Sequence, residues 1–240
     1  MSLINDMKNN CLICQKPLVY YPEAQEMACA FCGKTFSSNA ACEDGHFICD
    51  HCHAEKGLGV IREYCENSTS TDPIAMLTEI MQKDFIYLHG PEHHTMVASV
   101  LLTACHNSGA DFDLPAALSE AENRGKQVPG GFCGFQGCCG AAVGLGIFVS
   151  IYTAADPLSG KEWALANLAT SEALSAIAKL GGPRCCKRNS MTAVLTGIRF
   201  VKEHFGIELT KPSRILCGFS EENKECKKEQ CPYFDQKRSE

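Results

Sequence analysis

The chain has 240 residues, a hydrophobic fraction of 45%, a formal net charge of −6 and 17 cysteines. The length fits one large domain or two small ones, and the hydrophobic fraction is enough to bury a core, which excludes a wholly disordered chain. The negative balance gives no basic field, so nucleic acid is not expected as a partner.

The first ten residues, MSLINDMKNN, lack the apolar stretch of a secretory signal. The longest apolar run, residues 141–155, is too short to span a bilayer and is interrupted by glycines and hydroxyl side chains. We therefore expect a soluble, cytoplasmic protein that does not bind membranes. The odd number of cysteines argues against a closed set of disulfides, and in a reducing compartment dense cysteines indicate metal binding or redox chemistry.

Residues 1–65 are predicted to form a small Cys/His-rich module that binds zinc. Two C-x2-C pairs separated by fourteen residues have the spacing of a zinc ribbon: Cys11, Cys14, Cys29 and Cys32. Four thiolates give the tetrahedral shell that zinc prefers. Between the pairs, residues 18–21 and 26–28 are expected to form the two short strands of a hairpin.

A second group of ligand-type side chains follows: Cys42, His46, Cys49 and Cys52. Three sulfurs and one imidazole suit a second zinc ion, and His51, His53 and Cys65 are alternative ligands. Each site can take its ligands from consecutive residues, or the two sites can be interleaved, as in cross-brace domains. The spacing of the ligands does not decide between these two pairings. Both shells look full, which favours structural over catalytic zinc. A module of this size needs metal to fold, and its mostly acidic charges favour protein docking or scaffolding.

A polar linker at residues 66–71 precedes a domain, residues 72–240, that we predict to be all-helical. Apolar residues repeat at helical spacing in six segments: residues 73–88, 91–105, 115–123, 141–153, 161–180 and 190–205. The fourth segment is apolar on nearly all sides, so it is expected to be a buried central helix. The predicted fold class is mainly α, a helical bundle with a small N-terminal zinc-ribbon-like or treble-clef-like module.

Two glycine-flanked segments with adjacent cysteines lead into the fourth and the last of these helices. They contribute five thiols: Cys133, Cys138, Cys139, Cys185 and Cys186. The N–H groups and the macrodipole at a helix N-terminus stabilise anions, which predicts a depressed thiol pKa and a better ligand or nucleophile. We assign catalytic roles to both adjacent pairs, and Arg184 and Arg188 are expected to bind a substrate carboxylate or phosphate.

The C-terminal segment adds Cys217, Cys226 and Cys231, and a Cys-Pro step that ends a cysteine run occurs in iron–sulfur ligation. These three thiols and one from the Gly-Cys segments would complete a four-thiolate cluster, for which Cys133, Cys138 and Cys185 are the candidates. Three ligands alone would leave one iron open to a substrate. Zinc is the competing metal.

Two adjacent histidines begin the helix predicted at residues 91–105. His93 and His94 lie on neighbouring faces, so only one of them can point inward. We assign His93 as the group that moves protons.

The segments CGFQGCCGAA and GPRCCKR, together with the terminal NKEC and Cys231-Pro232, resemble a cysteine-rich family of anaerobic bacteria and archaea called domain of unknown function 5714. The resemblance covers about residues 72–234. Relatives in that family occur beside methyltransferase or radical-SAM-type modules, which implies anaerobic metal or sulfur chemistry. The Gly-Cys helix entrance is also similar in style to iron–sulfur serine dehydratases and cysteine desulfidases, although the cysteine spacing differs.

Two functions follow as expectations. The first is an iron–sulfur protein of anaerobic sulfur or one-carbon chemistry, such as a lyase or desulfidase-type enzyme, acting on a small anionic or sulfur-containing substrate. It requires the two adjacent-cysteine segments to converge in space. The second is a zinc-only binding module or adaptor that docks on a partner methyltransferase or radical-SAM-type enzyme.

Overall fold

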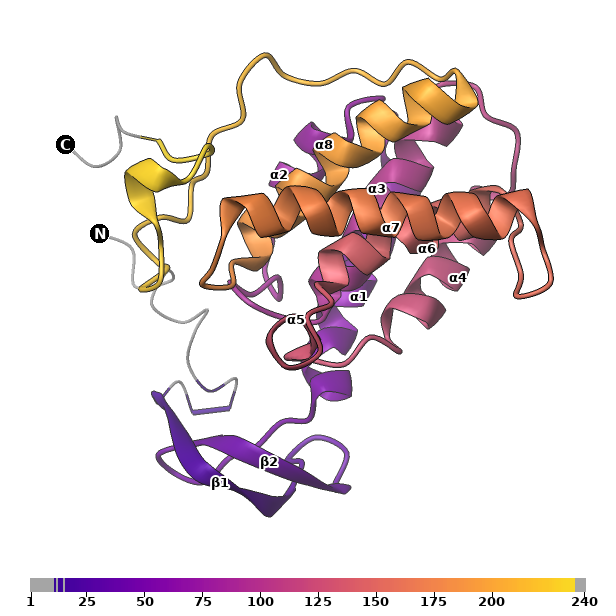
Figure 1. Cartoon of the computed structure of the whole chain (residues 1–240). Coiled ribbons are helices and arrows are strands. Elements are labelled where there is room, and N and C mark those ends of the chain that lie inside the picture. Colours follow the sequence, from indigo (N-terminus) through magenta and orange to yellow (C-terminus); the bar gives the residue numbers. More distant parts are fainter. Residues whose placement is uncertain (1–10, 12, 15, 236–240) are drawn as a thin grey trace.

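The computed structural model describes residues 11, 13, 14 and 16–235, so the N-terminal segment in which no secretory signal is expected lies outside the described residues. A small two-stranded sheet lies at one end of a larger helical bundle, and the C-terminal segment packs at the side of the bundle (Figure 1). The mainly helical fold class and the small N-terminal module agree with the sequence prediction. Among the described helices, none is both long and apolar enough to cross a membrane.

The sheet of the N-terminal module pairs β1 (Leu18–Ala28) with β2 (Thr35–Cys42) in antiparallel fashion. The expected hairpin between the C-x2-C pairs is therefore wrong, because its two strands are parts of one long strand. The register shifts between Tyr20 and Gln25, where an acidic, proline-containing stretch interrupts the ladder. The turn that joins the strands is the second C-x2-C pair itself, with Gly33 in the left-handed region at φ +70°.

Eight α-helices lie in the described part of the chain. They include the six that the apolar periodicity predicts, but the first of these ends at Gln82 and not at residue 88. Their bounds are α1 Asp50–Asn67, α2 Pro73–Gln82, α3 Glu92–Asn107, α4 Leu114–Gly125, α5 Phe132–Phe135, α6 Gly140–Tyr152, α7 Lys161–Leu180 and α8 Cys186–Phe205. A short 3-10 helix, η2, covers Lys228–Gln230. Asp72 caps α2 by accepting hydrogen bonds from two backbone N–H groups of the first turn, as the Asp-Pro pair predicts.

Helices α3 and α6 form the centre of the bundle. Nearly every residue of α3 is buried, and α6 is buried from Gly140 to Val149 except at Val143. The small residues of α6 permit this close approach, since a Cβ atom added at Gly144 would lie 2.5 Å from the backbone oxygen of His94 on α3.

Helix α1 joins the module to the bundle. It begins one residue after Cys49 and runs through the segment that the sequence assigned to the zinc module. Its buried face, which includes Leu58, Ile61 and Cys65, belongs to the core of the helical bundle. A single continuous helix therefore carries the last module ligand, Cys52, into the bundle (Figure 1).

Candidate metal centres

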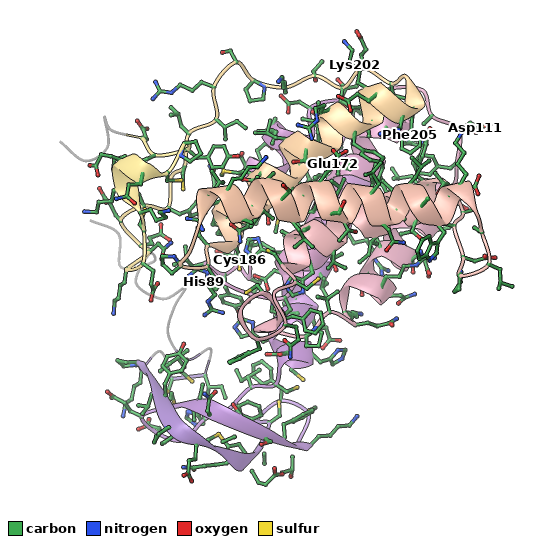
Figure 2. All side chains as sticks on the ribbon, viewed as in Figure 1. His89, Asp111, Glu172, Cys186, Lys202 and Phe205 are labelled. Carbon is green, nitrogen blue, oxygen red and sulfur yellow. The ribbon has the colours of Figure 1, made fainter. Side chains whose placement is uncertain are left out.

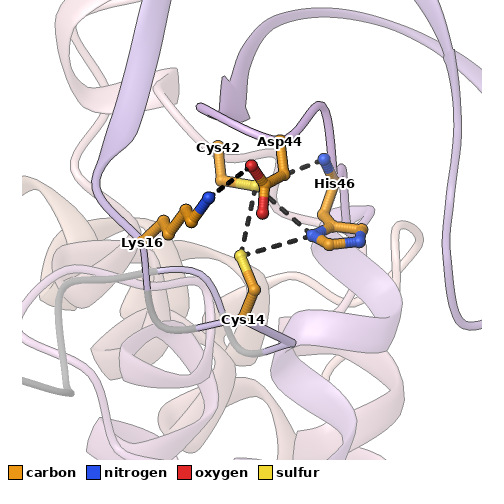
Figure 3. Close-up of polar contacts among 5 residues, drawn as sticks. All are labelled: Cys14, Lys16, Cys42, Asp44 and His46. Atoms are coloured by element: carbon orange, nitrogen blue, oxygen red, sulfur yellow. Dashed lines mark hydrogen bonds and ion pairs between the residues drawn. The ribbon is translucent and has the colours of Figure 1, made fainter.

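The N-terminal module contains one group of three sulfurs and an imidazole, made by Cys11, Cys14, Cys42 and His46. The Sγ atoms of Cys14 and Cys42 are 3.6 Å apart, and Nδ1 of His46 lies 3.4 Å from each of them (Figure 3). All four ligand atoms lie within 4.8 Å of one another. This group has the donor set and the spacing to hold one metal ion.

A second group has four thiols, those of Cys29, Cys32, Cys49 and Cys52, again within 4.8 Å of one another. The Sγ atoms of Cys32 and Cys49 are 3.9 Å apart. Burial acts to raise the pKa of Cys29, but N–H groups of Cys49, Cys32 and Phe31 bond its sulfur and lower the pKa to about 6. A sulfur held in this way is prepared to bind a cation as thiolate.

The ligands are interleaved, which was the alternative that the spacing left open. The register of the sheet explains the pairing, because Leu18 at the start of β1 pairs with Cys42 at the end of β2. The first C-x2-C pair, which precedes β1, therefore meets the residues that follow β2. At the other end of the sheet, the backbone N–H of Ala30 donates a hydrogen bond to the backbone oxygen of Phe47 (2.9 Å). This bond holds the segment before Cys49 next to the second C-x2-C pair.

The alternative ligands lie elsewhere. The imidazole of His53 packs at a tilt against the ring of Tyr87, with ring centroids 4.1 Å apart, and His51 lines a pocket between the module and the bundle. Cys65 is fully buried in the helical core, where burial raises its pKa to about 12. Beside the His46 group, Lys16 and Asp44 form a 2.6 Å ion pair across the module (Figure 3).

A third cysteine group lies in the helical domain, around a pocket at the N-terminal end of α8. It consists of Cys185, Cys217, Cys226 and Cys231. The pocket is small, with a volume of about 20 Å³. The structure thus brings one thiol of the Gly-Cys segments together with the three C-terminal thiols.

The C-terminal segment reaches this place because it runs back along α8. That helix has 20 residues and is about 30 Å long, and the ten residues from 207 to 216 span a similar length when extended. Figure 1 shows this segment crossing the bundle from the end of α8 toward its start. There Cys217 donates its backbone N–H to Tyr233 (2.6 Å), and Phe219 and Tyr233 are buried against the helical core.

Hydrogen-bond donors and cations surround these thiols. The N–H groups of Arg188, Phe219 and Lys228 lie 3.4–3.5 Å from the sulfurs of Cys185, Cys217 and Cys226, respectively. Asn223, which sequence reasoning did not assign, donates its side-chain amide to Cys185 at 3.7 Å. Lys187 and Arg188 line the same pocket and are both buried. Burial nevertheless raises the pKa of Cys185 and raises that of Cys217 to about 11, against the lowering effect of the N–H groups of Arg188 and Phe219.

The remaining thiols of the two Gly-Cys segments lie on another side of the α8 entrance. Cys139, the N-cap of α6, accepts a hydrogen bond from the side chain of Asn189 on α8 (3.4 Å). Cys133 and Cys139 line one pocket with Arg184, so the two segments face each other. Cys138 lines neither this pocket nor the one formed by the C-terminal thiols.

The expected depression of thiol pKa values at these helix entrances is wrong for three of the cysteines. Burial raises the pKa of Cys138 and of Cys185, and it raises that of Cys186 to about 12. The N–H of Arg188 lowers the pKa of Cys185 and that of Gly90, in the loop before α3, lowers the pKa of Cys186, but neither outweighs burial. Without a bound cation, these thiols remain protonated at neutral pH.

The two adjacent histidines take different positions. His93 is 1% exposed, and its ring atoms lie near the backbone oxygen of Tyr87 (3.1 Å) and the hydroxyl of Ser190 (3.4 Å) inside the core. His94 is only partly buried, bonds the backbone oxygen of Val128 (3.1 Å) and lines the pocket between module and bundle. The proton-transfer role assigned to His93 stays a prediction, and His94 is the histidine that a pocket ligand can reach.

Among known proteins, a similarity is found for the helical domain and the end of α1. The model of a family described as "Family of unknown function (DUF5714)" matches residues 61–234. The chain belongs to this family. The matched residues include every thiol of the Gly-Cys segments and of the C-terminal group, and the module lies almost wholly outside them. No curated protein and no solved structure matches the chain.

Proposed function

We propose that this protein holds one zinc ion in each of the two module groups and an iron–sulfur cluster in the helical domain, and that it acts in anaerobic sulfur or one-carbon chemistry. The observation that carries the proposal is the convergence of Cys185 with Cys217, Cys226 and Cys231 around one pocket. Family membership adds only the expectation of anaerobic metal or sulfur chemistry that the sequence motifs suggested.

Zinc in the module is supported by the distances between ligand atoms. With a Zn–S bond of about 2.3 Å, the edge of a tetrahedron of sulfurs is about 3.8 Å long. The sulfur pairs of the two groups lie at 3.6 and 3.9 Å. Each group supplies four protein ligands, which leaves no position for water, so the zinc ions have a structural role.

An iron–sulfur cluster is supported in the helical domain because the four thiols there are spread more widely. They share one pocket, yet no three of them gather within 4.8 Å as the module ligands do. A cluster attaches each thiolate to a different iron, so its ligands stand farther apart than those of a single ion. The space is too small for an organic substrate.

The neighbouring side chains fit the charge of such a group. Lys187 and Arg188 place two cations beside four thiolates, and three backbone N–H groups bond the sulfurs. A bound cluster would supply one-electron transfer, with a potential that depends on these charges and hydrogen bonds. Four protein thiolates leave no iron open, so the arrangement favours electron transfer over the lyase chemistry that needs an open iron.

Metal and sulfide analysis of the anaerobically purified full chain tests the proposal. We expect a brown protein with about four iron atoms per chain and broad visible absorbance. Cys226→Ala should lose the colour and the iron, whereas Cys138→Ala, in a loop outside the pocket, should keep both. A colourless, iron-free wild-type protein would overturn the proposed cluster.

A zinc-only adaptor is the second candidate function. It is favoured by aromatic side chains that the module leaves open to solvent, among them Tyr20 at 67% and Phe31 at 50% exposure. This function predicts zinc in place of iron at the C-terminal thiols and a partner enzyme docked on the module. The same metal analysis separates the two functions.

A further inference from the structure

A wide pocket lies between the module and the helical bundle, and its lining does not include the C-terminal thiols. Its volume is about 640 Å³, which is enough for a small organic molecule. Its walls come from the sheet, from the starts of α1, α3 and α8, and from the loop before α6. Figure 2 shows His89 and Cys186 close together at the end of the bundle that faces the module.

Two thiols and one cation meet in this pocket. Cys133 and Cys186 are both partly exposed in it, and the side chain of Arg184 is exposed there as well. In the part of the chain that the structure describes, no carboxylate forms an ion pair with Arg184, and Asp50 is the single acid in the pocket wall. Arg184 therefore offers a guanidinium group to an anion from solution.

The histidines of the wall add groups that can bond a ligand. The Nδ1 atom of His89 is buried and has no hydrogen-bond partner in the described structure. His94 lines the same wall, where its Nδ1 atom bonds the backbone oxygen of Val128 and its ring packs against Gly140 at the start of α6. An unpaired buried polar atom is costly, and a ligand that bonds it removes this cost.

We propose that this pocket binds a small organic anion that carries a thiol or disulfide sulfur, with Arg184 holding the anionic group and Cys133 and Cys186 facing the sulfur. The inference deepens the proposed sulfur chemistry but does not depend on the cluster. With a disulfide, the reaction is exchange: the sulfur of Cys133 bonds one substrate sulfur as the substrate S–S bond breaks. The other half leaves as a thiolate and takes up the proton that Cys133 lost.

The test compares two disulfides of similar size on the full, metal-loaded chain under anaerobic conditions. The anionic probe is 3,3′-dithiodipropionate and the neutral probe is bis(2-hydroxyethyl) disulfide. Mass spectrometry with peptide mapping measures the rate at which each probe modifies Cys133. We expect the anionic probe to react about tenfold faster at this thiol.

Matched variants assign this preference to the pocket. Arg184→Gln should remove it, whereas Arg199→Gln, which changes an arginine paired with Glu172 on another surface, should leave it intact. Cys133→Ser should lose the anion-selective modification, and Cys138→Ser in the same loop should keep it. Equal rates for the two probes in the wild-type chain, or a preference that survives Arg184→Gln, would overturn the inference.

The cluster and the pocket can fail separately. Iron content and visible absorbance are measured on the same samples. An iron-free wild-type chain that keeps the anion preference overturns the cluster and supports the pocket, and an iron-rich protein with no anion preference overturns the pocket while leaving the cluster in place.

Discussion

The N-terminal module and the C-terminal thiol pocket each gather four ligand-type side chains, but they do so at different spacings. In the module, each set of ligand atoms lies within 4.8 Å, whereas the thiols around the α8 entrance do not gather so closely. The local support is alike, because an N–H group two residues along bonds the sulfur of Cys11 in the module and of Cys217 and Cys226 in the tail. The two regions therefore share the same local hydrogen bond to a cysteine sulfur. They differ in how closely their ligand-type side chains gather.

The two regions also differ in what holds them together. The buried apolar cluster of the module consists of cysteines, with two neighbouring side chains packed on it. The C-terminal segment instead rests on the bundle, where Tyr233 bonds Thr192 at 2.9 Å and is buried with Phe219. The module should therefore depend on metal for folding, and the tail should depend on the core.

Metal removal is expected to have the largest effect. A strong chelator should unfold the sheet of the module, because zinc binding contributes about 10 kcal/mol or more in small domains of this kind. The helical bundle should keep its far-UV circular dichroism. Hydrogen exchange followed by mass spectrometry measures both regions at once, and continued protection of residues 18–42 after chelation would contradict the account.

Paired substitutions test the interleaved sites through the number of zinc ions per chain. Cys11→Ser with Cys42→Ser removes two ligands of one group, so one zinc ion should remain. Cys11→Ser with Cys29→Ser damages both groups and should remove both ions. Sequential pairing predicts the reverse order, so the zinc content of these two variants decides between the pairings.

A buried carboxyl contributes to the bundle a pH dependence opposite to that of the module. Burial raises the pKa of Glu92 from 4.5 to about 7, so the folded chain holds this proton more tightly than the unfolded chain. The stabilisation is complete below about pH 4.5 and is lost as the pH rises through 7, which amounts to about 3 kcal/mol. Metal binding by module thiolates is instead lost as the pH falls.

Glu92→Gln should remove this pH dependence from the stability of the bundle. Denaturant unfolding at about pH 5 and pH 8 should show the variant gaining stability relative to the wild type at the higher pH. A constant difference between the two proteins across this range would show that Glu92 does not titrate as described.

Glycine substitutions should separate the two regions with smaller effects. Gly144→Ala pushes α6 away from the backbone of α3 and should destabilise the bundle by about 1–3 kcal/mol. Gly45→Ala puts a side chain at a φ of +78° beside His46 and should weaken the module by about 1 kcal/mol. Thermal unfolding at fixed zinc should lower the bundle transition only for Gly144→Ala, and a shift of that transition by Gly45→Ala would mean that the regions unfold together.

The sequence predicted the eight module ligands because C-x2-C spacing is local. It did not predict their pairing, which the register of β1 and β2 decides over twenty or more residues. Helix α1 was missed because Gly57 and Gly59 interrupt its apolar pattern. Gly57 is required there by close packing, since an added Cβ would lie 2.6 Å from the backbone oxygen of Phe85.

In the helical domain, the sequence predicted that three C-terminal thiols would join one from a Gly-Cys segment. Only the fold shows that the fourth is Cys185, because the return of residues 207–216 along α8 is a tertiary feature. The raised pKa of Cys186 was missed for a similar reason: helix position is visible in sequence, but the burial that outweighs it is not. The sequence did offer a reason to single out Asn223, because it begins the NKEC segment that ends at Cys226.

Mössbauer spectroscopy with metal analysis on the anaerobically purified full chain tests the central claim most directly. The account predicts two zinc ions and about four iron atoms per chain, with the iron in a thiolate-ligated cluster that Cys185→Ala and Cys217→Ala each abolish. Zinc at the C-terminal thiols, or iron that persists in both variants, would contradict it.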